Sequence, residues 1–249
     1  MLRCILPLLL IVHSGVATAD EWGSIGGQTI VEGKIPEREV LIAKDEAVKD
    51  KQVCAAEEHL AEDLIIGKDS RGLANAFVYL TKKPKKIHPD YVVPPKEVVK
   101  FNTRMCQSVP HCLICRTDQL IEFRQDDAVA HWTDPNPLKN PKKSNLIATN
   151  LTEPQIFKHS RAELVPIRVD CDFHPWMRAY WLIIDHPYAA LTDEDGKFQI
   201  DNLPVGEHSF RIWHERIGDI NKKYKVSVTD GDRVELPAVS VSLDKLTSP

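Results

Sequence analysis

This sequence of 249 residues has no apolar run long enough to cross a lipid bilayer. Its longest such run covers residues 5–12, follows Arg3 and precedes the small residues Ala17, Thr18 and Ala19. A basic start, a short apolar stretch and an A-x-A-like site are typical of a secretory signal peptide. We therefore predict a signal peptide over residues 1–19, no membrane span, and a periplasmic or secreted protein.

The sequence also has little excess of charge. Its 32 Lys+Arg residues face 36 Asp+Glu residues, and the formal net charge is -4. Prolines interrupt the short basic clusters at 82–86 and 139–143, which are therefore interpreted as solvated loops. Because no basic stripe is present, we expect no nucleic acid partner.

Signature motifs of several enzyme classes are missing. His214 and Glu215 are followed by Gly218 where a zinc protease would need a second histidine, so H-E-x-x-H is absent. There is no Walker loop, no G-x-G-x-x-G and no G-x-S-x-G nucleophile elbow in the mature chain. Pairs of the form His-x-His, which multicopper oxidases use, are also absent. We therefore predict that the protein is not an enzyme.

Short β-strands dominate what is present. Seventeen prolines and eleven glycines separate short runs of branched and aromatic residues, several of which alternate apolar and polar positions. The runs that predict strands cover residues 73–80, 120–124, 164–169, 179–184, 196–200, 208–213, 224–228 and 239–243. Residues 45–64 could hold a helix and stay ambiguous. The sequence predicts an all-β fold.

Composition divides the chain further. A proline- and lysine-rich stretch at 82–95 is typical of a linker, and regular turn signals begin after residue 184. We predict an N-terminal β region over 20–95, a central domain over 96–185 and a C-terminal β segment over 186–249. In this last segment, D-G-K-F at 195–198 and L-P-V-G at 203–206 resemble the carboxypeptidase regulatory-like (transthyretin-like) β-sandwich. That resemblance implies a folding or binding module and brings no catalytic residues.

The stretch C-D-F-H-P-W-M at 171–177 groups three potential metal ligands within seven residues. Its Cys171, His174 and Met177 offer a thiolate, an imidazole and a thioether on one short loop, and copper binds these donors in both oxidation states. A fourth ligand is available in His131, forty residues upstream. A His₂Cys set with a weak axial Met is the composition of a blue-copper electron-transfer centre. Each residue alone is more typical of core packing; together they predict a copper site.

The same loop resembles a known family. C-x-x-H-P-aromatic-M is similar to the copper-binding loop of amicyanin-type cupredoxins, and the strand, acidic turn and His131 resemble the segment that supplies the first ligand in plastocyanin-like proteins. The likeness covers about 105–184 and implies a cupredoxin-like Greek-key sandwich. The whole array also resembles exported cupredoxin-like proteins labelled methylamine utilisation proteins, a label that establishes no role.

The resemblance implies roles for these residues. His131, Cys171, His174 and Met177 would be the copper ligands. The exposed edge of His174 would be the electron port, beside an apolar docking patch. One departure is Trp132, which stands where the family usually has an asparagine that braces the ligand loop.

Cysteine parity is compatible with a thiolate ligand. Five cysteines remain after the predicted cleavage, so at least one cannot pair, and Cys171 accounts for it. Cys54 and Cys106, which both flank predicted strands, form the predicted disulfide.

Cys112 and Cys115 form a C-x-x-C motif with several interpretations. If the segment is a strand, their Cα atoms lie about 10 Å apart, too far for a disulfide. We predict that both are reduced packing residues. The adjacent His111 could be a second metal ligand, although a structural role is the preferred interpretation.

These features predict an exported mononuclear type 1 copper protein in outer-sphere electron transfer with an unidentified redox partner protein. One alternative is a non-redox binding module whose aromatic residues would bind a carbohydrate or a protein: Trp132, Trp176, Tyr180, Trp181 and Trp213. Another is a copper carrier with the same ligands.

Overall fold

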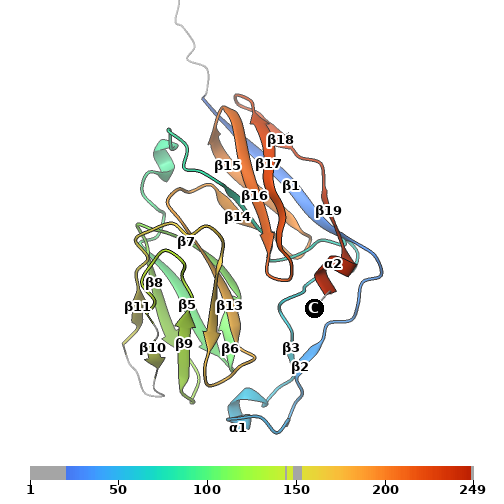
Figure 1. Cartoon of the computed structure of the whole chain (residues 1–249), viewed down its shortest axis with the longest axis vertical. Coiled ribbons are helices and arrows are strands. Elements are labelled where there is room, and N and C mark those ends of the chain that lie inside the picture. The colour runs from blue at the N-terminus through green and yellow to red at the C-terminus, as the bar shows by residue number, and fades with distance from the viewer. Residues whose placement is uncertain (1–20, 144, 148–152, 248–249) are drawn as a thin grey trace, which may run out of the picture.

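The computed structural model describes residues 21–143, 145–147 and 153–247, so the predicted signal peptide lies outside the described residues. Nearly all regular structure in these ranges is β (Figure 1). The helices there are short: α1 (Lys51–Cys54), the 3₁₀ turn η1 (Pro89–Tyr91) and α2 (Leu243–Thr247). None of the described helices is long and apolar enough to span a membrane. The predicted all-β fold is confirmed.

A first sandwich is built entirely from strands between residues 98 and 184. One sheet has the order β10 (Asn145–Ile147), β9 (His131–Pro135), β12 (Ile167–Cys171), β13 (Arg178–Ile184) and β7 (Cys112–Arg116). The facing sheet has the order β11 (Gln155–Phe157), β8 (Leu120–Gln125), β5 (Val98–Arg104) and β6 (Gln107–Val109).

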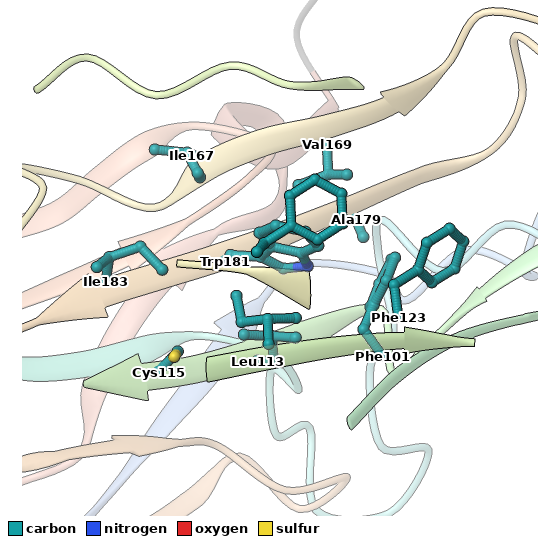
Figure 2. Close-up of a cluster of buried hydrophobic side chains, with 11 residues drawn as sticks. Phe101, Leu113, Cys115, Phe123, Ile167, Val169, Ala179, Trp181 and Ile183 are labelled. Atoms are coloured by element: carbon teal, nitrogen blue, oxygen red, sulfur yellow. The ribbon is translucent and has the colours of Figure 1, made fainter. Parts of the chain in front are cut away.

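The core of this sandwich is aromatic (Figure 2). Strand β13 alternates, so Ala179, Trp181 and Ile183 face the core while the residues between them face the opposite side of the sheet. The fully buried Trp181 ring lies edge-on to Phe101 of the facing sheet, with the ring centroids 5.0 Å apart. Aromatic contacts of this geometry contribute about 0.5–1.5 kcal/mol beyond area burial. They fix the frame from which the β12–β13 loop projects.

The second sandwich combines strands from both ends of the chain. One sheet contains β1 (Trp22–Glu32) between β15 (Lys197–Pro204) and the two short strands β18 (Arg233–Glu235) and β19 (Val239–Ser242). The other has the order β14 (Ala189–Leu191), β4 (Phe77–Leu80), β16 (Gly206–His214) and β17 (Gly218–Val228). The sheets of segment 186–249 are therefore completed by strands of segment 20–95.

Strand β1 was not among the predicted strands, because three glycines interrupt its apolar pattern. Tertiary contacts explain two of them. A Cβ at Gly27 would lie 2.8 Å from the Phe198 ring, and one at Gly23 would lie 2.3 Å from the Thr229 carbonyl oxygen. Glycine at these positions allows neighbouring groups to approach the strand closely.

A third apolar cluster joins the two sandwiches. Tyr180, Leu182 and Ile184 on the outer face of β13 pack with Phe77 and its neighbours on β4 of the second sandwich. The β4 strand alternates as well, so its other face contributes to the core of the second sandwich. Four sheets are thus stacked with three apolar layers between them.

An N-terminal arm leaves the second sandwich and runs beside the first (Figure 1). It contains β2 (Val40–Ile42), α1 and β3 (His59–Leu60), so the ambiguous stretch 45–64 holds one helical turn and one two-residue strand among loops. The predicted disulfide between Cys54 of α1 and Cys106 of the β5–β6 turn is confirmed. Cys112 and Cys115 are free and buried, as predicted. The disulfide ties the arm to the end of the first sandwich.

Candidate metal centre

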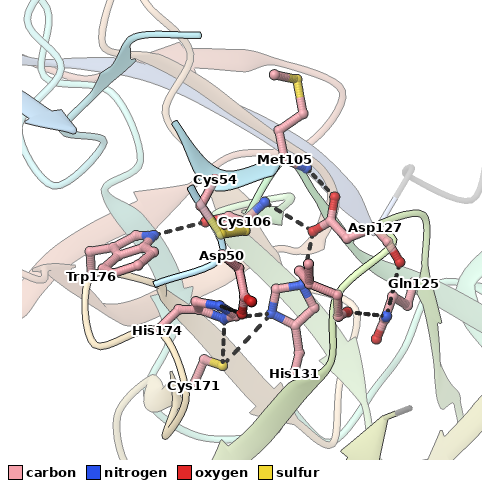
Figure 3. Close-up of a disulfide and its surroundings, with 11 residues drawn as sticks. Asp50, Cys54, Met105, Cys106, Gln125, Asp127, His131, Cys171, His174 and Trp176 are labelled. Atoms are coloured by element: carbon pink, nitrogen blue, oxygen red, sulfur yellow. Dashed lines mark hydrogen bonds and ion pairs between the residues drawn. A yellow bond between two sulfur atoms is a disulfide. The ribbon is translucent and has the colours of Figure 1, made fainter. Parts of the chain in front are cut away.

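Three of the predicted ligands meet at one end of the first sandwich (Figure 3). Strands β9 and β12 are antiparallel neighbours, and Cys171 is paired with Thr133. His131 lies two residues before Thr133, on the same face of the strand, which brings its ring to Cys171. The β12–β13 loop then turns back, with the Met177 amide donating to the His174 carbonyl at 2.9 Å. Strand pairing and one tight loop therefore position all three side chains.

The donor atoms form a triangle suited to one metal ion. The Cys171 Sγ lies 3.8 Å from His131 Nδ1 and 3.7 Å from His174 Nδ1, and the two nitrogens are 3.1 Å apart. With bonds of about 2.0 Å to nitrogen and about 2.3 Å to sulfur, a trigonal site separates nitrogen and sulfur by about 3.7 Å and the nitrogens by about 3.5 Å. His131 and His174 are fully buried, and Cys171 is 5% exposed. The residues present fit a copper ion of the His₂Cys type.

Local hydrogen bonds favour the thiolate form of Cys171. Burial alone raises the pKa of this thiol, but hydrogen bonds with the rings of His131 and His174 and with the backbone of Trp132 and His174 lower it to about 6. The thiolate, which is the form that binds metal, therefore predominates near neutral pH. Trp132, at the position where the resemblance implied asparagine, braces the loop through its backbone: its carbonyl accepts from the Asp172 amide at 3.2 Å.

Asp127 holds the ring of His131 from behind. Its Oδ2 lies 2.9 Å from His131 Nε2, and its carboxylate also accepts from the backbone amides of Met105 and Cys106 (Figure 3). Burial alone raises the pKa of Asp127, but the bonds from His131, Cys106 and Met105 outweigh it, and the pKa is lowered. The ionised carboxylate accepts a hydrogen bond from Nε2–H and leaves Nδ1 for a metal.

Asp50 plays the same part for His174. Its Oδ2 lies 3.0 Å from His174 Nε2, and it reaches the site from the start of α1 in the N-terminal arm. Trp176 lies against the same imidazole, with the ring centroids 5.2 Å apart, and donates to the Cys106 carbonyl at 3.3 Å. The prediction of an exposed His174 edge is wrong, because the arm covers the ring and leaves it 0% exposed.

Met177 lies beside one of the other three predicted ligands, Cys171. It is 3% exposed and packs in one apolar cluster with Cys171, Cys54 and Cys106. This placement puts a thioether next to the donor triangle. Its axial role stays a prediction.

Two functional candidates were missed by sequence reasoning. Asp127 belongs to an acidic pair visible upstream of His131, and its spacing of four residues is the only signal of its role. Asp50 is separated from His174 by 124 residues and lies in the ambiguous stretch, so no sequence pattern connects the two.

Comparison with known proteins yields only distant likenesses. No family model and no curated protein sequence matches the chain. Among solved structures, a Cu-containing nitrite reductase from Thermus scotoductus SA-01 matches 41% of this chain with a TM-score of 0.31 and 13% identity, and this chain spans 25% of its length.

Two smaller copper proteins are matched over nearly their whole length. A purple cupredoxin from Nitrosopumilus maritimus (TM-score 0.27, 14% identity) is covered to 97% by 34% of this chain. Amicyanin from Paracoccus versutus has a TM-score of 0.30 and 12% identity, and the match covers 96% of its chain and 43% of this chain. These likenesses are too weak to carry a functional assignment, which depends on the geometry of the site.

Proposed function

We propose that the protein binds one copper ion through Cys171, His131 and His174, with Met177 as a weak axial ligand, and exchanges electrons with a partner redox protein. One observation carries this proposal. A thiolate-forming sulfur and two imidazole Nδ1 atoms lie at the separations that one ion requires, while carboxylates hold both Nε2 atoms. Copper, when bound, supplies the change between the cuprous and cupric states.

The protein residues keep this geometry rigid. Cys171 is held by the β9–β12 pairing, His131 by Asp127 and His174 by Asp50. Because the rings and the sulfur are buried, water is excluded from the ligand positions. A site whose ligands are already in place needs little rearrangement when the electron count changes, which favours electron transfer over substrate chemistry.

The disulfide supports an oxidising compartment. Cys54 and Cys106 are paired in the structure, and such bonds persist mainly in secreted and periplasmic proteins. We therefore include export in the proposal, with the mature protein working in the periplasm or outside the cell.

A copper titration tests the proposed centre. Metal-depleted protein should take up one Cu(II) at this centre and develop an intense visible thiolate-to-copper band. Cys171→Ser should abolish the band, because a hydroxyl is neither soft nor ionised near neutral pH. Cys115→Ala is a matched control, since Cys115 is also a free buried cysteine but belongs to the sandwich core. A band that survives in Cys171→Ser, or no stoichiometric copper in the wild type, would refute the proposal.

The copper carrier is the second candidate, and one observation favours it: the buried His174 leaves no exposed ligand edge for electron exchange. Cyclic voltammetry together with copper transfer to a chelator separates the two functions. A reversible one-electron wave with slow copper release supports the electron carrier. The non-redox binding module is disfavoured, because Tyr180, Trp181 and Trp213 lie in apolar cores and form no stacking surface.

A further inference from the structure

A second cluster of metal-ligating side chains lies where the two sandwiches and the arm meet. His111 and Cys112 stand at the start of β7, and Glu215 follows β16. One donor atom from each of the three lies within 4.8 Å of the others. None of these residues belongs to the proposed copper centre.

These donors are buried and incompletely paired. His111 is 8% exposed, Cys112 is 6% exposed, and the Glu215 side chain is 4% exposed. His111 Nε2 contacts Glu215 Oε1, but its Nδ1 has no hydrogen-bond partner among the described residues, and a Glu62 carboxylate oxygen is 3.8 Å away. An unpaired polar atom in the interior costs about 1–3 kcal/mol, so an arrangement of this kind needs a compensating function.

A cavity of about 200 Å³ opens beside the cluster. His111, Glu62 and Glu215 line it, together with His59. His59 is 5% exposed, and its Nε2 also has no hydrogen-bond partner in the described part of the chain. Two buried imidazoles therefore face one cavity whose lining also includes four acidic residues, Glu62 and Glu215 among them. Met177, the predicted axial ligand of the copper centre, lines the same cavity.

We propose that His111, Cys112 and Glu215 form a second metal site for a divalent ion of the zinc class. Imidazole nitrogen, thiolate sulfur and carboxylate oxygen are the three donors that zinc accepts in proteins. Three protein ligands leave a fourth position, which opens toward the cavity and accepts water, as in zinc sites that keep one exchangeable ligand.

The binding step balances without a redox partner. The ion forms a bond to Cys112 Sγ as the S–H bond breaks, and it replaces the Nε2 proton that doubly protonated His111 shares with Glu215, so the proton on Nδ1 stays. Both protons pass to solvent, and the thiolate and carboxylate neutralise the two positive charges of the ion. Glu62 would then accept from His111 Nδ1, an orienting contact of the kind that metal-bound histidines usually make.

Zinc stoichiometry in a set of four proteins tests this site independently of the copper proposal. The wild type should bind two Zn²⁺ ions, since zinc also suits the copper ligands, and Cys171→Ala and Cys112→Ala should each bind one. The double variant should bind none. The second site is wrong if the Cys171→Ala protein binds no zinc. It is also wrong if the double variant, with Cys171→Ala and Cys112→Ala, still binds one ion. If Cys171→Ala still binds two ions, the copper proposal fails instead.

Cobalt(II) reports the sulfur ligand directly. In the Cys171→Ala protein, Co²⁺ alone should give a near-ultraviolet thiolate-to-cobalt band that disappears in Cys112→Ala and persists in Cys115→Ala. Glu215→Gln keeps the side-chain volume and serves if Cys112→Ala fails to fold; it should also lose the ion. Glu62→Gln should weaken Co²⁺ binding by about 10- to 100-fold. If the Glu215→Gln protein binds Co²⁺ with unchanged affinity, as followed by the thiolate-to-cobalt band, the assignment is overturned.

Discussion

At the scale of single residues, the carboxylates behind the histidines determine how well the site is organised. Asp127 joins His131 to the β5–β6 turn, because one carboxylate accepts from the imidazole and from two successive backbone amides. Those amides belong to Met105 and Cys106, which both have positive φ. Two positive φ values are what a two-residue type I′ hairpin turn requires. The charge of Asp127 thus stabilises a strained turn and a ligand at once.

Asp127→Asn should therefore weaken copper binding by about 10- to 100-fold, the usual effect of removing an orienting carboxylate. The amide lacks the charge and can donate in place of accepting, so His131 loses a defined orientation. Affinity can be measured by competition with a chelator. Asp126→Asn is the matched control, since this neighbour is exposed and its side chain accepts a hydrogen bond from Asn102 and not from His131. Equal affinities in the two variants would contradict the role of Asp127.

His186 makes stability depend on pH. It is buried, and its ring nitrogens lie 3.2 Å from the Leu80 carbonyl and 3.2 Å from the Tyr188 amide, so it is held neutral with the proton on Nε2. Burial lowers the pKa of His186 below its ordinary value of 6.5, although Asp185 acts in the opposite direction. At a pH between the lowered pKa of His186 in the folded protein and its ordinary pKa in the unfolded chain, the unfolded chain binds more protons. The free energy of unfolding therefore falls as the pH falls below about 6.5.

His186→Asn should make this decline shallower. The side-chain oxygen of asparagine can still accept from the Tyr188 amide, but it does not titrate. Urea unfolding at pH 7.5 and at pH 5 gives the free energy difference for each protein. An identical difference in the wild type and the variant would show that His186 is not responsible.

At the scale of elements, the N-terminal arm acts as a cover for the candidate copper site. Its helical turn α1 carries both Asp50, which contacts His174, and Cys54, which is bonded to Cys106. Without the disulfide, this short helix has few means of staying in place, because four residues are far too few for a stable helix. The covalent bond therefore decides whether His174 stays buried.

Replacing both Cys54 and Cys106 by alanine should lower the free energy of unfolding by about 2–5 kcal/mol, as expected for loss of a native disulfide in a small domain. The bond spans 52 residues of sequence, which places the expected value toward the upper end. It should also speed reduction of the copper-loaded protein by ascorbate, because His174 becomes accessible. Urea unfolding and stopped-flow absorbance measure the two effects. A reduction rate equal to that of the wild type would mean that the arm does not limit access.

At the scale of the whole molecule, buried residues of both sandwiches pack in one apolar layer, and we expect this layer to make them unfold together. Leu182 is fully buried in this layer and faces away from the core that contains Trp181. Leu182→Ala should lower the free energy of unfolding by about 2–5 kcal/mol through lost burial and a residual cavity.

Two optical probes can check that the sandwiches unfold together. Loss of the copper band reports the first sandwich and far-ultraviolet circular dichroism reports both, so the two urea transitions should shift by the same amount in Leu182→Ala. Transitions that separate in the variant or in the wild type would show that the sandwiches are stable independently.

The sequence by itself determined the chemistry and much of the local structure. Cys171, His174 and Met177 are close because only a few bonds separate them, so their spacing predicts a loop of metal donors whatever surrounds it. Strands β8 and β16 were predicted at nearly their observed bounds, because a half-buried strand requires alternation that is visible in single-sequence patterns. Strand β13 was predicted from a continuous apolar run, which a strand buried on both faces requires. The odd number of cysteines in the predicted mature chain and the strands flanking Cys54 and Cys106 also predicted the disulfide between these two residues.

Only the tertiary structure decided what covers the site and which strands share a sheet. The contact between Asp50 and His174 joins residues 124 positions apart, and no local pattern records it. Strand β1 was missed because its glycines oppose the local preference for strand, and only the close approach of Phe198 and Thr229 explains them. The same holds for His111 and Glu215, which are 104 residues apart and come together only where both sandwiches meet. Contacts of this kind depend on how whole sheets pack, and packing is a property of the assembled chain.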